Sequence, residues 1–500
     1  MYGGVGDILV GFLVSLVVYV LWSRRKLYLI SARLPGPFAL PIIGNGLYFL
    51  CDQQELLQRL VRLTNKYASS PMRIWLGPRL AIFVKDPDQL QIILQSSKMK
   101  QKSYIYSFLE PFMGQGLFTS GGNHHKNHRR ILQPLFGPTY VEGYSYLFQK
   151  HADKLAKALE AKADNTSFDV LHYLHEAAFE ATMDIMLEDK NEHSLDYKDM
   201  PAYVRRFYYI FVQRILNFWY HLQVIFERTS YYKEQKHMTN IALTMTKEIT
   251  DSLVPEIQKR LDCKDDVTKQ ANNEIRTPSM LETLMEMCNN KPDLLTEQEF
   301  TDHMMTFVAT SQDTQSSAIA FTLMMLGMHP EIQDAVVEEL NEALDGKDRI
   351  QFGDLGKLKY MEMCLKESMR LFPLGPFLIR DTVEDFPLGD LVLPQGCTVV
   401  LGIYNVHKSP KLWEKPNEYY PDHFLPEAAS KRHPYAYLPF SAGPRRCIAQ
   451  NYSYVNMKII VSTILQKFRV YCEGDLKNLE LITDVSIRPK NGYLIKLLPK

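Results

Sequence analysis

The segment FSAGPRRCIA, residues 440–449, holds the side chains with the most distinctive chemistry in the chain. Its Cys447 can bind haem iron only as a thiolate, which requires backbone donors and an electropositive setting. Gly443 permits a close turn of the backbone around the sulfur, and Arg445 can pair with a haem propionate. A helix that begins near Cys447 would add its positive end beside the sulfur. Together with Phe440, the pattern predicts a haem-binding loop rather than an inert buried cysteine.

A long helix is expected over residues 296–328, opened by a capping box between Thr296 and Glu299 and closed before Pro330. Both ends of this helix are apolar, but residues 310–317, TSQDTQSS, form a polar island in its middle. Hydroxyl groups there can bond back to carbonyls one turn earlier and bend the helix. Such a bend would open a notch for dioxygen and water. The alternative is a solvated helix face.

The sequence KESMR places Glu367 and Arg370 three residues apart. On a helix these two positions share one face, so their side chains can form an ion pair. The motif is too short to be informative alone, and its value comes from its place in a series. It follows the polar island and precedes the cysteine loop, with WEKP at 413–416 and PDHF at 421–424 between them.

These segments, in this order, resemble the landmarks of the cytochrome P-450 family, and the resemblance extends from Pro35 to the C-terminus. It implies a cytochrome P-450 fold that encloses haem b, held without a covalent link apart from the bond between iron and the Cys447 thiolate. Glu367 and Arg370 would support the segment that carries the cysteine. His423 stands in the position of the third member of that network.

The same resemblance assigns the remaining site residues. Asp313 and Thr314 match the acid and the threonine of the family's oxygen-activation motif, where Thr314 would direct protons and Asp313 would relay them. The further haem contacts would be His125, Arg129 and Arg380.

Within the family, the sequence is most similar to the fatty-acid ω-hydroxylase branch and its insect relatives, through SSAIAFTL at 316–323, MHPEIQ at 328–333 and PFSAGPR at 439–445. An acidic residue that can be ester-linked to haem in some members of this branch is Thr310 here, so no covalent haem bond is expected. The other departures are Ser311 for glycine, Gln315 for threonine, His125 for tryptophan, His423 for arginine and Ala449 for glycine.

Most of the remaining sequence has the apolar spacing of helices, for example at residues 147–159 and 332–344. Strand-like segments cluster at 72–84 and 382–402. The length of 500 residues alone favours two or three domains, yet no second linker and no internal repeat is apparent. We therefore expect residues 46–500 to form one large haem-enclosing domain that is mainly α with a smaller β-rich part.

The N-terminus carries a separate signal. Residues 8–22, ILVGFLVSLVVYVLW, are uncharged, and the basic residues RRK follow directly at 24–26. A signal peptide would carry its positive charge before the apolar run, whereas basic residues after an anchor stay on the cytoplasmic side. Residues 1–26 are therefore interpreted as a retained membrane anchor. Residues 27–45, with three prolines in seven positions, are interpreted as a stiff elbow.

Composition excludes some classes of protein. Lys+Arg and Asp+Glu both number 57, so the formal net charge is zero and no basic surplus indicates a nucleic-acid partner. The seven cysteines are scattered and contain no CxxC pair. This spacing argues against a disulfide framework or a structural zinc site and fits a reducing compartment.

The expected function is an NADPH-dependent monooxygenase that inserts one oxygen atom from dioxygen into an apolar substrate, such as a fatty acid, terpenoid, pheromone, sterol or xenobiotic. The resemblance implies NADPH–cytochrome P-450 reductase as electron donor, with cytochrome b5 as a further candidate. It also implies the endoplasmic reticulum membrane, with the catalytic domain on the cytoplasmic side. The sequons at Asn165 and Asn451 should then be unglycosylated.

Two alternative functions stay open. The first is an oxygen-independent haem-thiolate isomerase or dehydratase, against which the retention of Asp313 and Thr314 argues, since such chemistry needs no proton relay to dioxygen. The second is a catalytically silent haem-binding membrane protein, which the departures from the family pattern allow.

Residues 205–232 are unusually aromatic, with ten aromatic side chains. Rings with a polar tip suit a membrane interface or the mouth of an apolar pocket, and ordinary helix packing is the third interpretation.

Overall fold

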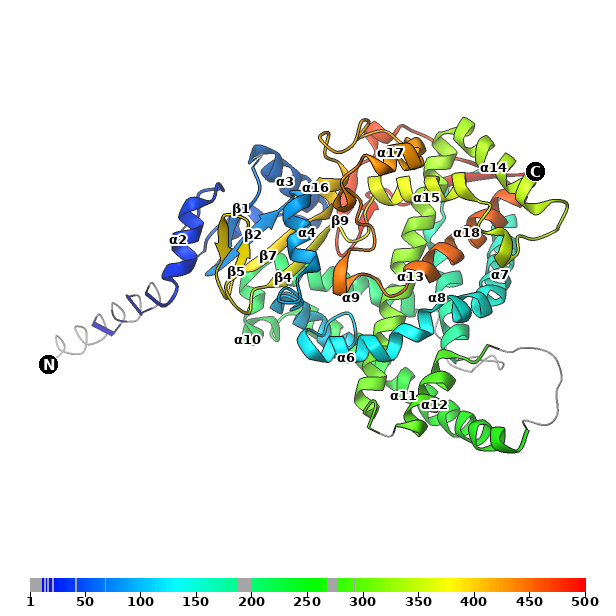
Figure 1. Ribbon diagram of the computed structural model, residues 1–500, viewed down its shortest axis with the longest axis horizontal. Helices are drawn as coiled ribbons and strands as arrows, with labels where there is room; N and C mark the ends of the chain where they lie inside the picture. The colour runs from blue at the N-terminus through cyan, green and yellow to red at the C-terminus, as the bar shows by residue number, and fades with distance from the viewer. Residues whose placement is uncertain are drawn as a thin grey trace.

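The computed structural model describes residues 11–12, 15, 18–19, 22–40, 43–67, 69–187, 199–267, 277–291 and 293–500, with backbone alone for 263–267. Helices make up most of this part of the chain, and a four-stranded sheet lies on the side from which the N-terminus extends (Figure 1). This is the mainly α architecture with a smaller β-rich part that the sequence predicts.

The helices differ greatly in length, and the longest, α11 and α13, pack on one another. The α-helices are α2 (Arg25–Arg33), α3 (Gln53–Lys66), α4 (Pro87–Gln95), α5 (Glu110–Met113), α6 (Gly122–Leu132), α7 (Pro138–Glu160), α8 (Leu171–Leu187), α9 (Met200–Leu216), α10 (Gln223–Phe226), α11 (Ser230–Val267), α12 (Met280–Asn290), α13 (Glu297–Met328), α14 (Pro330–Leu344), α15 (Lys359–Leu371), α16 (Ile403–His407), α17 (Pro426–Ser430) and α18 (Gln450–Lys467).

The strands form four small sheets. The largest has the order β1-β2-β7-β4, with β2 and β7 parallel and the other neighbours antiparallel, and the smaller ones are β3-β11-β8, β9-β10 and β5-β6. The strands are β1 (Met72–Leu76), β2 (Arg79–Val84), β3 (Phe168–Asp169), β4 (Phe377–Asp381), β5 (Phe386–Leu388), β6 (Leu391–Leu393), β7 (Thr398–Gly402), β8 (Phe468–Tyr471), β9 (Leu481–Thr483), β10 (Ile487–Pro489) and β11 (Leu494–Pro499).

Helix α13 runs through the middle of the helical part and packs against α8, α15 and α18 (Figure 1). Its start is the expected capping box, in which Thr296 and Glu299 satisfy each other's backbone N–H groups. Most of its side chains are buried around the whole circumference, which is why it carries little hydrophobic asymmetry. A buried helix of this kind can deliver polar side chains to the interior of the domain.

The expected helical segments 147–159 and 332–344 lie within α7 and α14. The strand-like segments are also present, as β1 and β2 and as β5 to β7. Strand β4 begins before the expected second cluster, and β8 to β11 lack a clear sequence signal. These strands are short, and β11 is stabilised by pairing with β3 and β8, which are remote in sequence.

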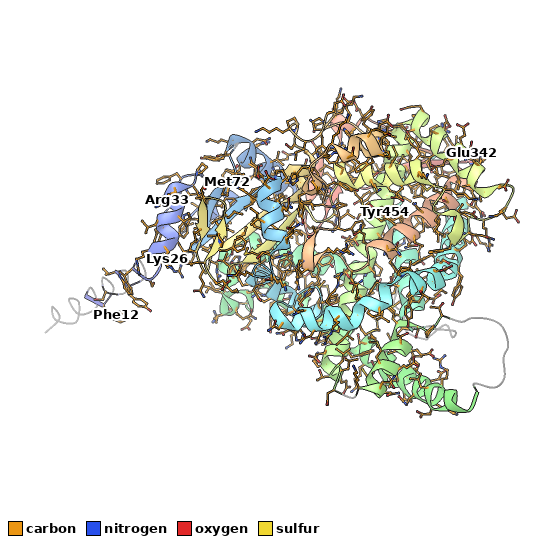
Figure 2. All side chains as sticks on the ribbon, viewed as in Figure 1. Phe12, Lys26, Arg33, Met72, Glu342 and Tyr454 are labelled. Carbon is orange, nitrogen blue, oxygen red and sulfur yellow. The ribbon has the colours of Figure 1, made fainter. Side chains whose placement is uncertain are left out.

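The expected anchor at residues 8–22 lies largely outside the described residues. Within the described part of the chain, no helix combines the length and the apolar character needed to cross a bilayer. Residues 27–33 of the expected elbow are helical, because they belong to α2. Figure 2 shows Lys26 and Arg33 on this helix, with Phe12 beyond its N-terminal end.

Helix α2 and the proline-rich segment after it are fixed to strand β1. The Trp75 indole N–H donates to the Ser31 hydroxyl over 2.8 Å, and the Arg73 N–H donates to the Pro35 carbonyl over 2.8 Å. Contacts with β1 therefore hold the proline segment in place, in addition to the restriction that each proline puts on its own backbone.

Candidate active site

A cavity of about 500 Å³ lies at the junction of the sheet, α13 and the cysteine loop. Side chains from positions more than 300 residues apart in the sequence meet on its wall. The expected site residues that line it are His125, Arg129, Asp313, Thr314, Arg380, Phe440, Arg445 and Cys447.

Cys447 sits where the loop turns into α18, which begins three residues later at Gln450. Its N–H donates to the Phe440 carbonyl over 2.9 Å, and this bond closes the loop. Burial raises the pKa of the Cys447 thiol, while the Ala449 N–H and the positive charge of Arg129 lower that pKa. A coordinating metal ion deprotonates a thiol outright, so the site fits a thiolate ligand.

Gly443 opens the short turn Gly443–Arg445 that leads to Cys447, and it also meets helix α4. Its φ is 71°, a left-handed conformation that favours glycine, and a Cβ there would collide with the Leu94 carbonyl of α4. The glycine therefore allows the loop to approach α4.

One side of the cavity holds a cluster of basic side chains. The terminal nitrogens of Arg445 are buried and have no hydrogen-bond partner among the described residues. Burial, followed by the nearby Arg380, lowers the pKa of Arg445 to about 9. The same surroundings lower the pKa of His125 to about 3, chiefly through burial and then through Arg445. Buried and unpaired positive charge is costly, and a dianionic group such as the haem propionates would compensate it.

Lys102 belongs to this cluster of basic side chains and was not anticipated. Burial lowers its pKa well below the ordinary value, and Arg380 and Arg445 lower it further. Its ammonium lies 3.8 Å from the centre of the Tyr106 ring. Nothing in the local sequence marks this lysine, because its position depends on a bridge between residues 102 and 380 that joins distant segments.

Helix α6 delivers His125 and Arg129, one turn apart, to the same side of the cavity. The Arg129 guanidinium donates to the Arg446 carbonyl over 2.7 Å, so α6 is tied to the cysteine loop. Its Nε donates to the Gln133 side chain.

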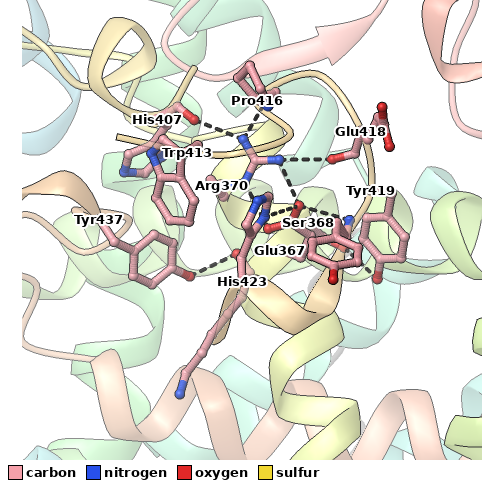
Figure 3. A network of polar contacts seen from close by, with 12 residues as sticks. Glu367, Ser368, Arg370, His407, Trp413, Pro416, Glu418, Tyr419, His423 and Tyr437 are labelled. Atoms are coloured by element: carbon pink, nitrogen blue, oxygen red, sulfur yellow. Dashed lines mark hydrogen bonds and ion pairs between the residues drawn. The ribbon is translucent and has the colours of Figure 1, made fainter. Parts of the chain in front are cut away.

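The expected ion pair on α15 is present and fully buried (Figure 3). Arg370 donates from Nε and Nη2 to the two carboxylate oxygens of Glu367 over 2.8 and 2.7 Å. Its other N–H groups donate to the backbone carbonyls of His407, Pro416 and Glu418. All donors of the guanidinium are used, so the pair fixes the backbone of the segment that leads to the cysteine loop.

His423 completes this network in place of an arginine. Its Nδ1 lies 3.1 Å from the Glu367 Oε1 and donates to it, and the Tyr420 N–H donates to the same oxygen over 3.0 Å. Burial raises the pKa of Glu367, but the hydrogen bonds from Arg370 and His423 lower it more, so the carboxylate stays ionised. The substitution therefore preserves contact with the glutamate.

His407 links the network to the cysteine loop and was not anticipated. Its carbonyl accepts from Arg370, and its Nε2 accepts the Leu438 N–H over 2.7 Å (Figure 3 shows the first of these bonds). Burial and then Arg370 lower its pKa to about 3, so the imidazole is neutral and can accept. Leu438 opens the segment that ends at Cys447. His407 therefore connects the Glu367–Arg370 network to the cysteine loop.

The polar island of α13 has the expected back-bonded hydroxyls. Thr314 donates to the Thr310 carbonyl over 3.0 Å, and Thr310 donates to the Thr306 carbonyl over 2.8 Å. Thr314 is exposed to the cavity. It can therefore present its hydroxyl oxygen to a molecule bound there.

The Asp313 carboxylate is 2% exposed and lies within a second polar cluster. The Ser486 hydroxyl donates to it over 2.7 Å, with Arg488 at 4.0 Å and His175 at 3.7 Å. Arg488 also pairs with Asp484. The hairpin of β9 and β10 brings Ser486, Arg488 and Asp484 to α13, and no local sequence pattern indicates this contact.

Burial raises the pKa of Asp484 to about 6, against the lowering effect of Arg488, and Asp313 raises it further. Asp484 also lines the cavity. Arg488 is within 4.0 Å of Asp313 and also pairs with Asp484, and the raised pKa of Asp484 lets its carboxyl exchange a proton near neutral pH.

The rest of the cavity wall is predominantly apolar. Three side chains of the aromatic stretch 205–232 line the cavity, namely Tyr208, Phe211 and Phe218, which supports the pocket interpretation for these positions. The main apolar lining residues are Phe49, Leu56, Leu60, Ile74, Leu109, Phe211, Leu216, Phe218, Phe377, Leu378 and Val485.

Residues 34–497 match the cytochrome P450 family, and the chain belongs to that family. It is therefore a cytochrome P450-type monooxygenase, and haem b held through a cysteine thiolate is its cofactor.

The similar relatives come from insects and mammals. Cytochrome P450 4c3 of Drosophila melanogaster is 30% identical over 521 residues, covering 99% of this chain and 95% of that protein. Cytochrome P450 4V2 of Homo sapiens is 32% identical over 466 residues, covering 92% and 88%. The crystal structure of the cytochrome P450DA heme domain is similar with a TM-score of 0.75 at 20% identity, covering 93% of this chain and 98% of that one. The expected family resemblance, including its insect relatives, is confirmed.

Proposed function

We propose that this chain is a membrane-bound enzyme that receives electrons from NADPH through NADPH–cytochrome P-450 reductase and inserts one oxygen atom into an apolar substrate. The observation that carries the proposal is the lining of the cavity. A thiol and a cluster of basic side chains, among them the unpartnered guanidinium of Arg445, line the cavity together with many apolar side chains.

In this proposal Cys447 is the iron ligand, and Arg445 and Arg380, with Lys102, His125 and Arg129, receive the propionates. When bound, the haem supplies the iron at which dioxygen is activated. Phe440 packs beside the loop, within 5.4 Å of the Tyr454 ring centre. Glu367, Arg370 and His423 position the loop from outside the cavity.

Thr314 would orient a water molecule at the cavity surface by accepting a hydrogen bond from it, because its own hydroxyl hydrogen is donated to the Thr310 carbonyl. Asp313 would exchange protons with the Asp484–Arg488 pair behind it. The cluster gives Asp313 a proton source away from the apolar side of the cavity.

The substrate is proposed to be an apolar molecule such as a fatty acid, terpenoid, sterol, pheromone or xenobiotic. The aromatic and aliphatic lining supports this class, since burial of apolar surface contributes about 25 cal/mol per Å². Thr310 replaces the acidic residue that could be ester-linked, so the haem is proposed to stay non-covalent.

Attachment to the cytoplasmic face of the endoplasmic reticulum is proposed from the anchor at residues 1–26 and an exposed apolar patch. Leu222, Val224 and Ile225, in and beside α10, are 62%, 61% and 37% exposed. Phe38 is 82% exposed and lies on the proline segment that follows α2. Exposed apolar side chains next to an anchor fit a membrane surface.

The test is a screen of purified haem-loaded protein against lipid and terpenoid libraries, read as substrate-induced shifts of the haem spectrum. Hits are then assayed for product and NADPH consumption with reductase present. Reductase-dependent product is expected. Conversion of a hydroperoxide without reductase would favour the isomerase alternative, and absence of any turnover with bound ligands would favour the silent protein. Omission of cytochrome b5 from matched assays tests whether it contributes.

A further inference from the structure

A second chemically distinctive cluster lies outside the cavity, where α6 crosses the N-terminal part of α13. His124 and His128 stand one turn apart on one face of α6, and Glu299 faces them from α13. One ligand atom from each of the three side chains can be chosen so that all lie within 4.8 Å of one another. We propose that His124, His128 and Glu299 form a zinc site that joins these two helices.

Each histidine lies within 4 Å of the glutamate oxygen. The His128 Nε2 is 3.3 Å from the Glu299 Oε1, and the His124 Nδ1 is 3.9 Å from the same oxygen. Zinc bonds of about 2.0–2.2 Å in a tetrahedron place neighbouring ligand atoms about 3.3 Å apart. The two imidazole nitrogens lie within 4.8 Å of each other, so binding requires the partly exposed His124 side chain to move toward both other ligands.

Both imidazoles have an acceptor on the side away from the site. The His124 Nε2 lies 3.1 Å from the Gln115 carbonyl, so it donates there, and the Nδ1 lone pair is directed to the site. The His128 Nδ1 lies 2.8 Å from the Nε2 of the buried His303, which can accept from it. Zinc-binding histidines typically donate their second N–H to such acceptors, which fixes the tautomer.

Glu299 is oriented by the helix start. Its Oε2 accepts from the Thr296 N–H and hydroxyl over 2.9 and 3.0 Å in the capping box. The other oxygen is therefore left to face the histidines. A capping box holds this carboxylate in place before any ion arrives.

Two imidazoles and one carboxylate are the ligands of a three-residue zinc site, with a fourth position for water. Imidazole ligands select zinc over magnesium or calcium. The side chains of His124 and Glu299 are 33% and 29% exposed, so an ion can enter from solvent. Cysteine spacing gave no indication of this site because it contains no cysteine.

The bound ion would fix α6 against α13. Helix α6 also carries His125 and Arg129 on the cavity wall, so the site couples zinc occupancy to the rigidity of that wall. This inference does not depend on the substrate or on the redox partner.

The test uses the full-length, haem-loaded protein after treatment with a chelator and dialysis. Zinc is titrated by calorimetry, and bound zinc is counted after equilibrium dialysis, with magnesium in excess. The parent protein is expected to bind one zinc ion at this site. Glu299→Gln and His124→Ala should each weaken the binding by at least about tenfold. Glutamine retains the capping box, so loss of binding in Glu299→Gln reports the ligand and not the helix start.

His237→Ala is the matched control, because His237 is an exposed histidine of α11 far along the sequence. It should bind zinc like the parent, and zinc should raise the Tm of both but not of the two ligand variants. Equal zinc affinity in the parent and in both ligand variants would overturn the proposal, and so would the absence of binding at micromolar zinc in the parent. The haem spectrum of each variant establishes that it is folded.

Discussion

Thr314 donates its hydroxyl to the Thr310 carbonyl at the cavity surface. We expect Thr314→Ala to retain haem but to divert electrons to hydrogen peroxide or water. Ser311 and Gln315 also line the cavity, so their polar groups should compensate in part and the loss of coupling should be graded. The measurement is product formed per NADPH consumed, with peroxide quantified.

Thr322→Ala is the matched control, because Thr322 is a back-bonded threonine of the same helix that does not line the cavity. Its coupling ratio should equal that of the parent. An unchanged ratio in Thr314→Ala would remove the assigned role and favour the isomerase or the silent protein.

Glu367 and Arg370 are both fully buried, so neither can lose its partner without leaving a charge in the interior. We expect Glu367→Ala or Arg370→Ala to cost on the order of 3–5 kcal/mol and to prevent stable haem incorporation. The haem-to-protein ratio after purification measures this effect. Glu338→Ala, at an exposed glutamate of α14, should leave that ratio unchanged. Full haem content in either α15 variant would show that the pair is dispensable.

The residues that could be anticipated are those whose partners are local or belong to a recognisable motif, such as Cys447, Arg445 and the Glu367–Arg370 pair. Lys102, His407 and Asp484 were not anticipated. Their roles depend on neighbours that are distant in sequence, including Arg380, Leu438 and Asp313. A lysine, a histidine or an aspartate alone is more often a surface residue than part of such a cluster.

Helix α15 is connected to the cysteine loop through His407, the last residue of α16. The His407 imidazole must be neutral to accept the Leu438 N–H, and burial holds its pKa at about 3 against an ordinary value of about 6.5. The unfolded chain binds the proton first, so this contribution to stability is present above about pH 6.5. It is lost as the pH falls toward 3, at about 1.4 kcal/mol per pH unit.

We therefore expect His407→Gln to retain haem to lower pH than the parent, because the glutamine carbonyl can accept the same N–H without titrating. Haem release is followed by absorbance across pH 7 to 4. His172→Gln, at an exposed histidine of α8, serves as control and should follow the parent curve. Coincident curves for the parent and His407→Gln would contradict the assignment.

Helices and strands could be predicted where a long stretch of sequence has regularly spaced apolar residues. Helix α13 and its capping box, α7, α14 and the β1–β2 hairpin lie where the sequence indicates them. Prediction failed for β8 to β11, which are only three to six residues long. Strand β11 pairs with β3 and β8, far from it in sequence, while β9 and β10 form a hairpin of three residues on each side, too short for a clear alternating pattern. The helical conformation of residues 27–33 was also missed, since the three nearby prolines all follow the helix.

At the scale of the whole molecule, the exposed apolar patch at Leu222, Val224 and Ile225 bears on membrane attachment. We expect removal of residues 1–26 to release much of the protein from membranes, but not all of it, because this patch makes a second, weaker contact. Sedimentation of the truncated protein with vesicles measures the remaining fraction.

Leu222→Ser together with Val224→Ser in the truncated protein should abolish that remaining binding, whereas the exposed Leu243→Ser of α11 should not. Complete release by truncation alone would remove the second contact. Undiminished binding after truncation would contradict the anchor.

The central claim is that Cys447 supplies a thiolate to haem iron in a cavity whose cations receive the propionates. Its most direct test is the absorbance spectrum of the reduced protein under carbon monoxide, because a thiolate ligand shifts the main haem band far to longer wavelength than an imidazole ligand does. The parent and Cys472→Ser, which alters a cysteine outside the cavity, should both give the shifted band. Cys447→Ser should lose it. A shifted band that persists in Cys447→Ser would contradict the assignment of Cys447 as the ligand.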